Sequence, residues 1–228
     1  MKYHVEFDLT LRRNPYKGVY IAFEGVDGSG KTTQAEILGK YLEERGIEVV
    51  TTSEPRRDRP VGILIHQILQ GIVKVPSVSL QYLYTADRII NHNKVVEPAL
   101  SAGKFVISHR CLWSNLPYGM LDKREVNYDS DDAKTINVAH GLMSLYNQFI
   151  IPDITFYLRV SAETAMKRLK KIKEIKELYE KYGKIEKVIR GYEWQLKQFP
   201  DEFVVIDAEK SEGEVAGKIR SFIDKKIK

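Results

Sequence analysis

The chain has 228 residues, 43% of them hydrophobic and 29% charged, with 36 basic against 31 acidic side chains and a formal net charge of +5. This length and composition favour one folded domain with a sizeable core, and the interleaved charges favour a solvated surface over a nucleic-acid-binding face. The single cysteine, Cys111, excludes an internal disulfide and a cysteine-rich metal framework. No apolar run approaches the length of a membrane span and the N-terminus lacks a signal segment, so we expect a cytoplasmic protein with no membrane partner.

The first predicted element is a half-buried strand over residues 2–12, where polar and apolar side chains alternate before Asn14-Pro15. We assign residues 1–17 to an N-terminal extension that contains this additional strand, which would lie at a sheet edge or reach a partner subunit. Residues 18–228 then form one domain, which opens with a buried strand at 19–23.

The segment after that strand, residues 25–32, reads G-x-x-x-x-G-K-T and is followed by a helical pattern over 33–45. A buried strand before such a segment and a helix after it are the context of a phosphate-binding loop. The glycines allow successive backbone N–H groups and the helix N-terminus to point at one anion. Lys31 would reach the β- and γ-phosphates of a nucleoside triphosphate, and the Thr32 hydroxyl would bind Mg²⁺. The predicted ATP-binding residues are Gly25, Asp27, Gly28, Ser29, Gly30, Lys31, Thr32 and Thr33.

The rest of the chain continues to alternate between strands and helices. In order, we predict a strand at 49–52, helices at 60–69 and 79–100, a strand at 105–108, a helix at 133–149, strands at 154–160 and 203–206, and a helix at 211–227. Such alternation predicts an α/β fold with a parallel five-stranded sheet and helices on both faces, the three-layer sandwich of a P-loop NTPase. Ligands of such sheets bind beyond the carboxyl ends of the strands, where Glu54, His109, Arg110 and Arg159 also fall.

Residues 168–187 are rich in lysine and glutamate and too polar for a core helix. They would form either a solvated helical face or a lid over the nucleotide, and we predict a helical lid.

Four segments resemble the thymidylate kinase family, in an order and spacing that fit from about residue 18 to the C-terminus. Residues 23–34 resemble the family's phosphate-loop signature, and Ser53-Glu54-Pro55 resembles its segment after the second strand. Residues 82–88, Tyr-Leu-Tyr-Thr-Ala-Asp-Arg, are similar to its L-L-F-x-A-D-R helix, and residues 152–158 are similar to its P-D-L-T-x-Y-L strand. Archaeal members are the ones that the chain resembles.

The resemblance implies a reaction in which the γ-phosphoryl group of Mg-ATP passes to the 5′-phosphate of dTMP, giving dTDP and ADP. It implies Mg²⁺ as cofactor, ATP as co-substrate, and a homodimer formed through helices beside the acceptor site. Phosphoryl transfer needs positioning and charge neutralisation more than covalent chemistry, so arginines around the two phosphates are expected.

The resemblance also implies roles at the acceptor site. Tyr84 would stack on the pyrimidine, and Arg88, one helical turn later on the same face, would hold the nucleotide. Arg110 would grip the acceptor phosphate, Arg57 would contact a phosphate, and Asp27 would meet the sugar 3′-hydroxyl. The implied acceptor-binding residues are Asp27, Glu54, Arg57, Tyr84, Arg88, Arg110, Ser114, Tyr118 and Tyr179.

Several positions depart from the family pattern. His109 stands where the family has an aspartate tied to magnesium; an imidazole replaces an oxygen ligand of Mg²⁺ poorly but can donate a hydrogen bond to a phosphate. Arg159 replaces a common aspartate, although archaeal members also carry arginine there, and Gly119 falls where bacterial members often have a base-contacting glutamine. The phosphate loop carries Gly28 at the position of a transfer arginine, so Arg168 of the predicted lid is the candidate for that role. The predicted catalytic residues are Lys31, His109, Arg110 and Arg168.

These departures leave the acceptor open. The alternatives are a kinase for another pyrimidine nucleotide or for a deoxynucleoside, and a nucleotide-binding homologue with little turnover. A GTPase-type switch is disfavoured because the chain has no guanine-reading N-K-x-D motif.

Overall fold

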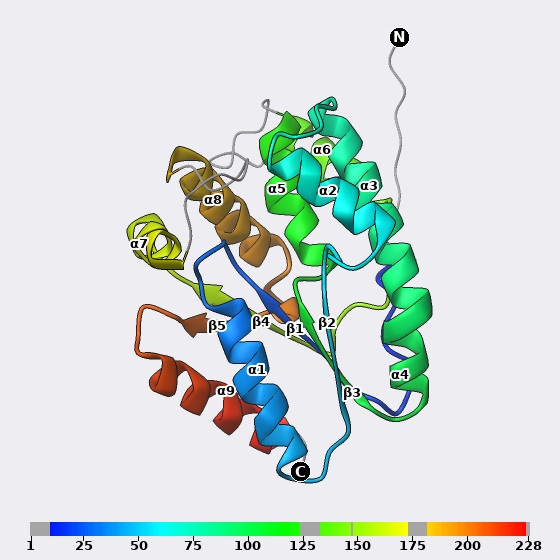
Figure 1. Ribbon diagram of the computed structural model, residues 1–228, viewed down its shortest axis with the longest axis vertical. Coiled ribbons are helices and arrows are strands. Elements are labelled where there is room, and N and C mark those ends of the chain that lie inside the picture. Colours follow the sequence, from blue (N-terminus) through cyan, green and yellow to red (C-terminus); the bar gives the residue numbers. More distant parts are fainter. Residues whose placement is uncertain (1–9, 124–132, 147, 173–181, 227–228) are drawn as a thin grey trace.

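The computed structural model describes residues 10–123, 133–146, 148–172 and 182–226. In this part of the chain, five strands form one sheet in which all neighbours are parallel, in the order β2-β3-β1-β4-β5 (Figure 1). The strands are β1 (Tyr20–Glu24), β2 (Val49–Ser53), β3 (Phe105–His109), β4 (Ile154–Arg159) and β5 (Val204–Asp207). The predicted α/β fold with a five-stranded parallel sheet is therefore confirmed.

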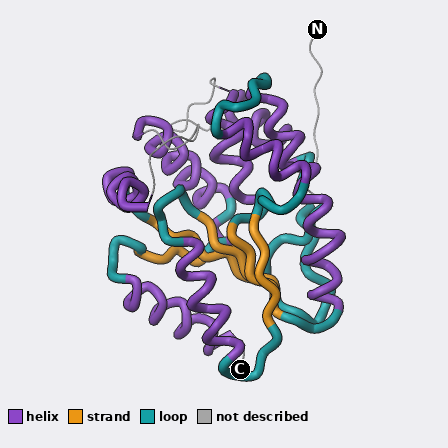
Figure 2. Tube along the Cα trace, viewed as in Figure 1, coloured by secondary structure: helices purple, strands orange, loops and turns teal. Residues whose placement is uncertain are grey.

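The central strand β1 is buried along its whole length, because helices cover both faces of the sheet (Figure 2). Ile21 and Phe23 point to the face covered by α1 (Lys31–Glu43) and α9 (Glu212–Lys226). Tyr20 and Ala22 point to the opposite face. This continuous burial explains why residues 20–23 of β1 are all apolar instead of alternating in polarity.

Two groups of helices cover that opposite face. Next to Tyr20 lies α4 (Glu97–Ser101), and next to Ala22 lie α5 (Asn115–Lys123), α6 (Ala133–Met143) and α8 (Tyr182–Gln198). The helices α2 (Pro60–Leu69), α3 (Ser77–Asn91) and α7 (Ala162–Ile172) complete the described set; α2 packs against α3, and α7 against α8. The register sets Phe23 opposite both His109 and Phe156, so that the carboxyl ends of three strands lie at one edge.

The predicted helix over 79–100 differs in detail. It begins at Ser77 and runs as α3 into a π-helical turn at His92–Val96 and then into α4. The wide turn directly precedes Pro98, whose ring lacks an N–H and would crowd the carbonyl of Lys94 in a regular α-helix. The wider turn gives the proline the space it needs.

The predicted helix over 133–149 is too long, because α6 ends at Met143. A turn follows, and Ile150 then forms an isolated parallel bridge with Arg12. Most of the additional strand predicted over residues 2–12 lies outside the described residues, and the division into an extension and a domain stays a prediction.

The helix α5 was not predicted, and α7 and α8 were predicted only where they overlap the helical lid at 168–187. The helix α5 contains Pro117 and Gly119, which read as helix breakers in the sequence but lie in and just after its first turn. The helices α7 and α8 flank residues 173–181, so the predicted lid at 168–187 coincides with the end of α7, the start of α8 and a segment outside the described residues. None of the helices in the described part of the chain has the length and apolarity that a membrane crossing requires.

Candidate functional site

The loop between β1 and α1 adopts the backbone that its glycines allow. Gly25, Gly28 and Gly30 have φ angles of 139°, 83° and 98°, in the region that side chains rarely adopt. A Cβ atom at Gly25 would lie 2.9 Å from the carbonyl oxygen of Leu158, and one at Gly28 would lie 2.4 Å from that of Ala165. The loop can therefore hold its path only with glycine at these positions.

This loop forms one wall of a cavity of about 880 Å³ at the carboxyl edge of the sheet. The cavity extends from the turn after β5, at Ala208 and Lys210, past the loop to the α3 helix at Tyr84 and Arg88. Its length brings together most of the residues that the sequence predicts for ATP and for the acceptor. The predicted site residues that line it are Asp27, Gly28, Ser29, Gly30, Lys31, Thr32, Thr33, Glu54, Arg57, Tyr84, Arg88, His109, Arg110, Ser114, Tyr118 and Arg168.

Lys31 is the first residue of α1, and its ammonium group lies inside the loop. The Nζ atom donates to the carbonyl oxygens of Gly25 and Val26, at 2.9 and 2.8 Å, and lies 3.6 Å from Asp27 Oδ1. Burial, with a smaller contribution from the positive charge of Arg110, lowers the pKa of Lys31 from 10.5 to about 7. A polyanion in the cavity would favour the charged form.

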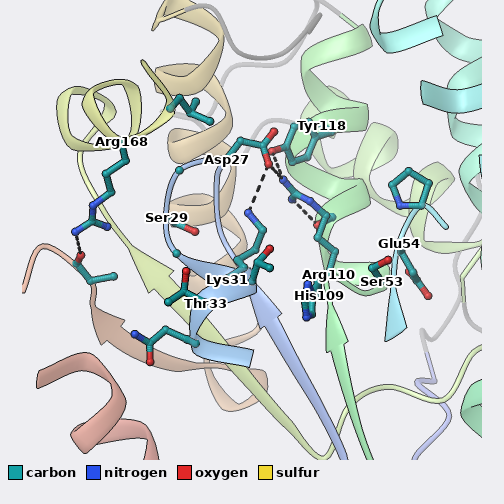
Figure 3. A pocket seen from close by; sticks show the side chains of 18 of the residues that line it. Asp27, Ser29, Lys31, Thr33, Ser53, Glu54, His109, Arg110, Tyr118 and Arg168 are labelled. Carbon is teal, nitrogen blue, oxygen red and sulfur yellow. Dashed lines mark hydrogen bonds and ion pairs between the residues drawn. The ribbon is translucent and has the colours of Figure 1, made fainter. Parts of the chain in front are cut away.

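Arg110 extends from the end of β3 toward the same aspartate (Figure 3). Its Nη2 atom donates to Asp27 Oδ1 at 2.6 Å and to the Tyr118 hydroxyl at 3.0 Å. Its Nη1 atom donates to Ser114 Oγ at 3.0 Å and to the carbonyl oxygen of Gly25 at 3.2 Å. The backbone φ of Arg110 is 74°, which turns the chain sharply at the edge of the sheet. Lys31 and Arg110 thus converge on one carboxylate.

The end of the cavity beside α3 contains a buried ion pair. Arg88 Nε donates to Glu54 Oε2 at 2.6 Å, and its Nη2 atom donates to the carbonyl oxygen of Cys111 at 3.1 Å. The remaining Nη1 atom is buried and has no hydrogen-bond partner among the described residues. Tyr84 comes from the same helix and lines the same end of the cavity. An arginine held on two sides with one unsatisfied nitrogen can offer that nitrogen to a ligand.

His109 ends β3 and lines the cavity next to Arg110 (Figure 3). Burial, together with the positive charge of Lys31, lowers the pKa of its imidazole below 6.5. Both effects favour the neutral form of the imidazole.

In the described part of the chain, no cluster of three or more His, Cys, Asp or Glu side chains is arranged to hold a metal ion. The Thr32 hydroxyl at the start of α1 is a suitable oxygen ligand for Mg²⁺, which usually keeps several waters and takes its other ligands from substrate phosphates. The residues present therefore fit a magnesium ion that enters with a nucleotide.

Two sequence-derived positions lie apart from the Asp27 centre. Arg168, on α7, donates from Nη2 to the carbonyl oxygen of Ala208 at 2.8 Å, on the other side of the loop from Arg110 (Figure 3). Tyr179 lies outside the described residues. Arg159 does not line the cavity but forms a two-fold ion pair with Glu193 of α8, at 2.8 and 2.7 Å.

Gly119 lies where the α5 helix approaches α6 and α3 closely. A Cβ atom there would lie 2.8 Å from a methyl carbon of Leu142 and 3.1 Å from the side-chain amide carbon of Gln81. Gln81 and Asn115, which were not predicted, line the cavity in this region and are joined by a 3.2 Å hydrogen bond. Because Gly119 has no side chain, the amide of Gln81 from α3 has room beside it. Spacing along the sequence does not reveal this contact.

Known proteins similar to this chain are thymidylate kinases. The statistical description of the family "Thymidylate kinase" matches residues 23–219. A thymidylate kinase of Thermosipho africanus is 34% identical over 214 residues, which are 92% of this chain and 99% of that protein. A probable thymidylate kinase of Thermococcus kodakarensis is 30% identical over 214 residues, 90% of this chain and 97% of that one. The solved structure of thymidylate kinase from Candida albicans has a TM-score of 0.79 at 24% identity, covers 92% of each chain, and shows the same fold.

Proposed function

The chain belongs to the thymidylate kinase family, and on that basis we propose a role for each part of the cavity in the phosphorylation of dTMP. Members are ATP-dependent nucleoside monophosphate kinases: the γ-phosphoryl group of ATP passes to dTMP, giving dTDP and ADP. The observation that carries the assignment of roles is the convergence of two cations on Asp27. Lys31 Nζ lies 3.6 Å and Arg110 Nη2 2.6 Å from the same oxygen, so a donor and an acceptor phosphate can meet there.

On the donor side, the loop and the N-terminus of α1 hold the phosphates of ATP. The backbone N–H groups supply hydrogen bonds, and Lys31 exchanges the carbonyl oxygens of Gly25 and Val26 for phosphate oxygens. Thr32 would hold Mg²⁺, which neutralises phosphate charge and orients the oxygens around it. His109, whose surroundings favour the neutral imidazole, hydrogen-bonds a phosphate or orders Arg110.

On the acceptor side, Arg110 grips the 5′-phosphate while Ser114 and Tyr118 hold its guanidinium in place. Arg57 contacts a phosphate from the turn after β2, and Asp27 serves the sugar hydroxyl. Tyr84 stacks on the pyrimidine. Arg88, fixed by Glu54, presents Nη1 to the base edge, which gives that buried nitrogen its missing partner.

Arg168 and Tyr179 complete the proposal as parts of the lid. Arg168 would stabilise the transferred group, for which its guanidinium must leave the carbonyl oxygen of Ala208. A homodimer is supported by exposed apolar side chains on the helices beside the acceptor end, at Ile63 on α2 and at Tyr82 and Ile89 on α3. A cytoplasmic location and the lack of a nucleic-acid partner stay predictions from the sequence.

The function is tested by an ADP-coupled assay at fixed Mg-ATP across dTMP, dUMP, UMP, CMP and thymidine. We expect the highest kcat/KM with dTMP and dTDP as product. A faster reaction with another acceptor would identify that acceptor as the substrate. If none of the five acceptors is phosphorylated, the kinase assignment is contradicted. Lys31→Ala is the control, because the loop needs its ammonium group for transfer.

A further inference from the structure

Glu24, the last residue of β1, carries a carboxylate that does not line the cavity and is fully buried. Two backbone N–H groups, of Cys111 and Ser114, donate to its Oε1 atom at 2.8 and 3.1 Å. The Ser114 and Tyr192 hydroxyls donate to its Oε2 atom, both at 2.7 Å. Burying a carboxylate is costly unless donors of this kind surround it, so its presence needs an explanation beyond packing.

The donors come from two segments that lie far apart in the sequence. Cys111 and Ser114 belong to the turn that follows Arg110 and leads into α5, and the Cys111 Sγ atom also lies 3.3 Å from Oε1. Tyr192 lies on α8, which packs along α5 (Figure 1). Burial and the negative charge of Glu24 raise the pKa of Tyr192 well above 10, so its hydroxyl keeps its proton and remains a donor. One carboxylate therefore joins the central strand, the turn after β3 and α8.

The Ser114 hydroxyl connects this carboxylate to Arg110. Its single proton goes to Glu24 Oε2, which leaves its lone pairs to accept from Arg110 Nη1 at 3.0 Å. Arg110 also has the left-handed backbone of φ 74°, so it needs support from its surroundings to keep this conformation. Glu24 accepts hydrogen bonds from the backbone N–H groups of Cys111 and Ser114, and these bonds fix the residues that follow Arg110.

An ionised carboxylate suits this place because it only accepts hydrogen bonds. A glutamine would turn an NH₂ group toward donors on one side, and at least one buried donor would lose its partner. An aspartate would keep the charge but is one methylene shorter.

We propose that Glu24 is a positioning residue that holds Arg110 in the orientation needed to grip the acceptor phosphate. This inference rests on the proposed role of Arg110. Glu24 itself does not touch either substrate: it fixes the turn and the Ser114 hydroxyl, and these fix the guanidinium. Tyr192 ties the same arrangement to α8.

The test compares Glu24→Gln, Glu24→Asp and Tyr192→Phe with Tyr157→Phe as matched control. Tyr157 is buried and its ring stacks on that of Tyr192 at 5.0 Å, but Glu24 receives no hydrogen bond from it. For each variant, kcat and KM for dTMP, the Kd of ATP and of dTMP from calorimetry, and the melting temperature are measured.

We expect Glu24→Gln to lower kcat/KM for dTMP roughly 100-fold, as a displaced catalytic group does, and Tyr192→Phe to lower it roughly tenfold. Glu24→Asp should fall between the wild type and Glu24→Gln. The Kd of ATP should change less than about threefold in Tyr192→Phe, and Tyr157→Phe should keep wild-type kinetics.

A lowered melting temperature with unchanged dTMP kinetics in Tyr192→Phe would overturn the inference, as would equal losses of ATP and dTMP binding. Tyr192→Phe keeps the inference testable if Glu24→Gln does not fold. Wild-type protein without dTMP turnover would contradict the proposed function instead. In that case weaker dTMP binding by Tyr192→Phe than by Tyr157→Phe would still support the positioning role, and equal binding would overturn it.

Discussion

At the residue scale, the most consequential finding is that the same aspartate contacts the cations expected for both phosphates. Asp27 pairs with Arg110 at 2.6 Å and lies 3.6 Å from Lys31. Its charge stabilises Arg110 and raises the pKa of Lys31 against the burial that lowers it. The two cations are therefore already held beside one carboxylate before a nucleotide binds, and binding only changes their partners.

The lowered pKa of Lys31 predicts a pH dependence of ATP affinity. Above its pKa of about 7, the free protein must take up a proton before the ammonium can meet the phosphates. Affinity should thus fall as the pH rises from 7.5 to 9, by up to about tenfold per unit. Calorimetric titration with ATP measures it, and Lys31→Arg should remove the slope because a guanidinium stays charged. A flat wild-type profile would contradict the prediction.

Tyr84 should act on the acceptor alone. We expect Tyr84→Ala to raise the KM for dTMP by roughly five- to 150-fold, the equivalent of about 1–3 kcal/mol for a stacked base, with little change in the Kd of ATP. Tyr84→Phe keeps the aromatic face and should stay near wild type. Steady-state kinetics at saturating ATP measure the effect. An equal loss of ATP and dTMP binding would show that this helix does not belong to the acceptor site.

Replacing Arg88 should have a larger effect than replacing Tyr84, because Arg88 forms a buried ion pair with Glu54. Arg88→Ala should weaken dTMP binding and also lower stability by about 3–5 kcal/mol, because Glu54 would stay buried without its partner. Denaturant unfolding of Arg88→Ala and of the double variant with Glu54→Gln measures this: the double variant should recover stability but not dTMP binding. Recovery of both would place Arg88 outside the acceptor site.

At the element scale, close backbone contacts decide where the helices sit. The α2 helix passes so near the turn after β2 that a Cβ atom at Gly62 would lie 1.6 Å from the carbonyl oxygen of Arg56. That turn also carries Arg57, which lines the cavity. The absence of a side chain at Gly62 therefore lets α2 pack against the turn that carries Arg57, an arginine that we propose for the acceptor site.

Gly62→Ala should consequently lower stability by about 1–3 kcal/mol and raise the KM for dTMP, since the helix or the turn must move. The matched control is Gly217→Ala on α9, where an added Cβ meets nothing within 4 Å. That control should gain about 0.5–1 kcal/mol, because alanine favours a helix more than glycine does. Denaturant unfolding and dTMP kinetics check both variants. Wild-type stability in Gly62→Ala would refute the close contact.

At the scale of the whole molecule, the α2 and α3 helices carry exposed apolar side chains that we propose to lie in a dimer interface. Ile63, Tyr82 and Ile89 are 44%, 62% and 37% exposed on α2 and α3, beside the proposed acceptor end of the cavity. We expect Ile63→Asp with Tyr82→Asp to convert a dimer into a monomer, measured by sedimentation velocity. The control is Val205→Asp, which is 41% exposed on β5. A monomeric wild type would contradict the proposed dimer.

The main features of the fold could be predicted because they depend on local pattern. Buried apolar runs such as 19–23 and the spacing of the phosphate loop specify strands, helices and their alternation. The helix α5 and the part of α8 beyond residue 187 could not, because Pro117, Gly119 and Gly191 resemble loop residues until tertiary packing stabilises the helices. The π-helical turn at His92–Val96 could not be predicted either, because the sequence around Pro98 reads as one continuous helix.

The candidate site also has one part that the sequence predicts and another that depends on the tertiary structure. The sequence by itself determined the phosphate loop, Lys31, and the residue types at the ends of the strands, because a parallel sheet brings those ends to one edge. Only the tertiary structure decided which of them meet: Asp27 with Lys31 and Arg110, Arg159 with Glu193 instead of the cavity, and Arg168 with Ala208. Glu24 acquires its role from donors 87 to 168 residues away in the chain. Side-chain partners of such separation depend on the packing of whole elements, which no local pattern encodes.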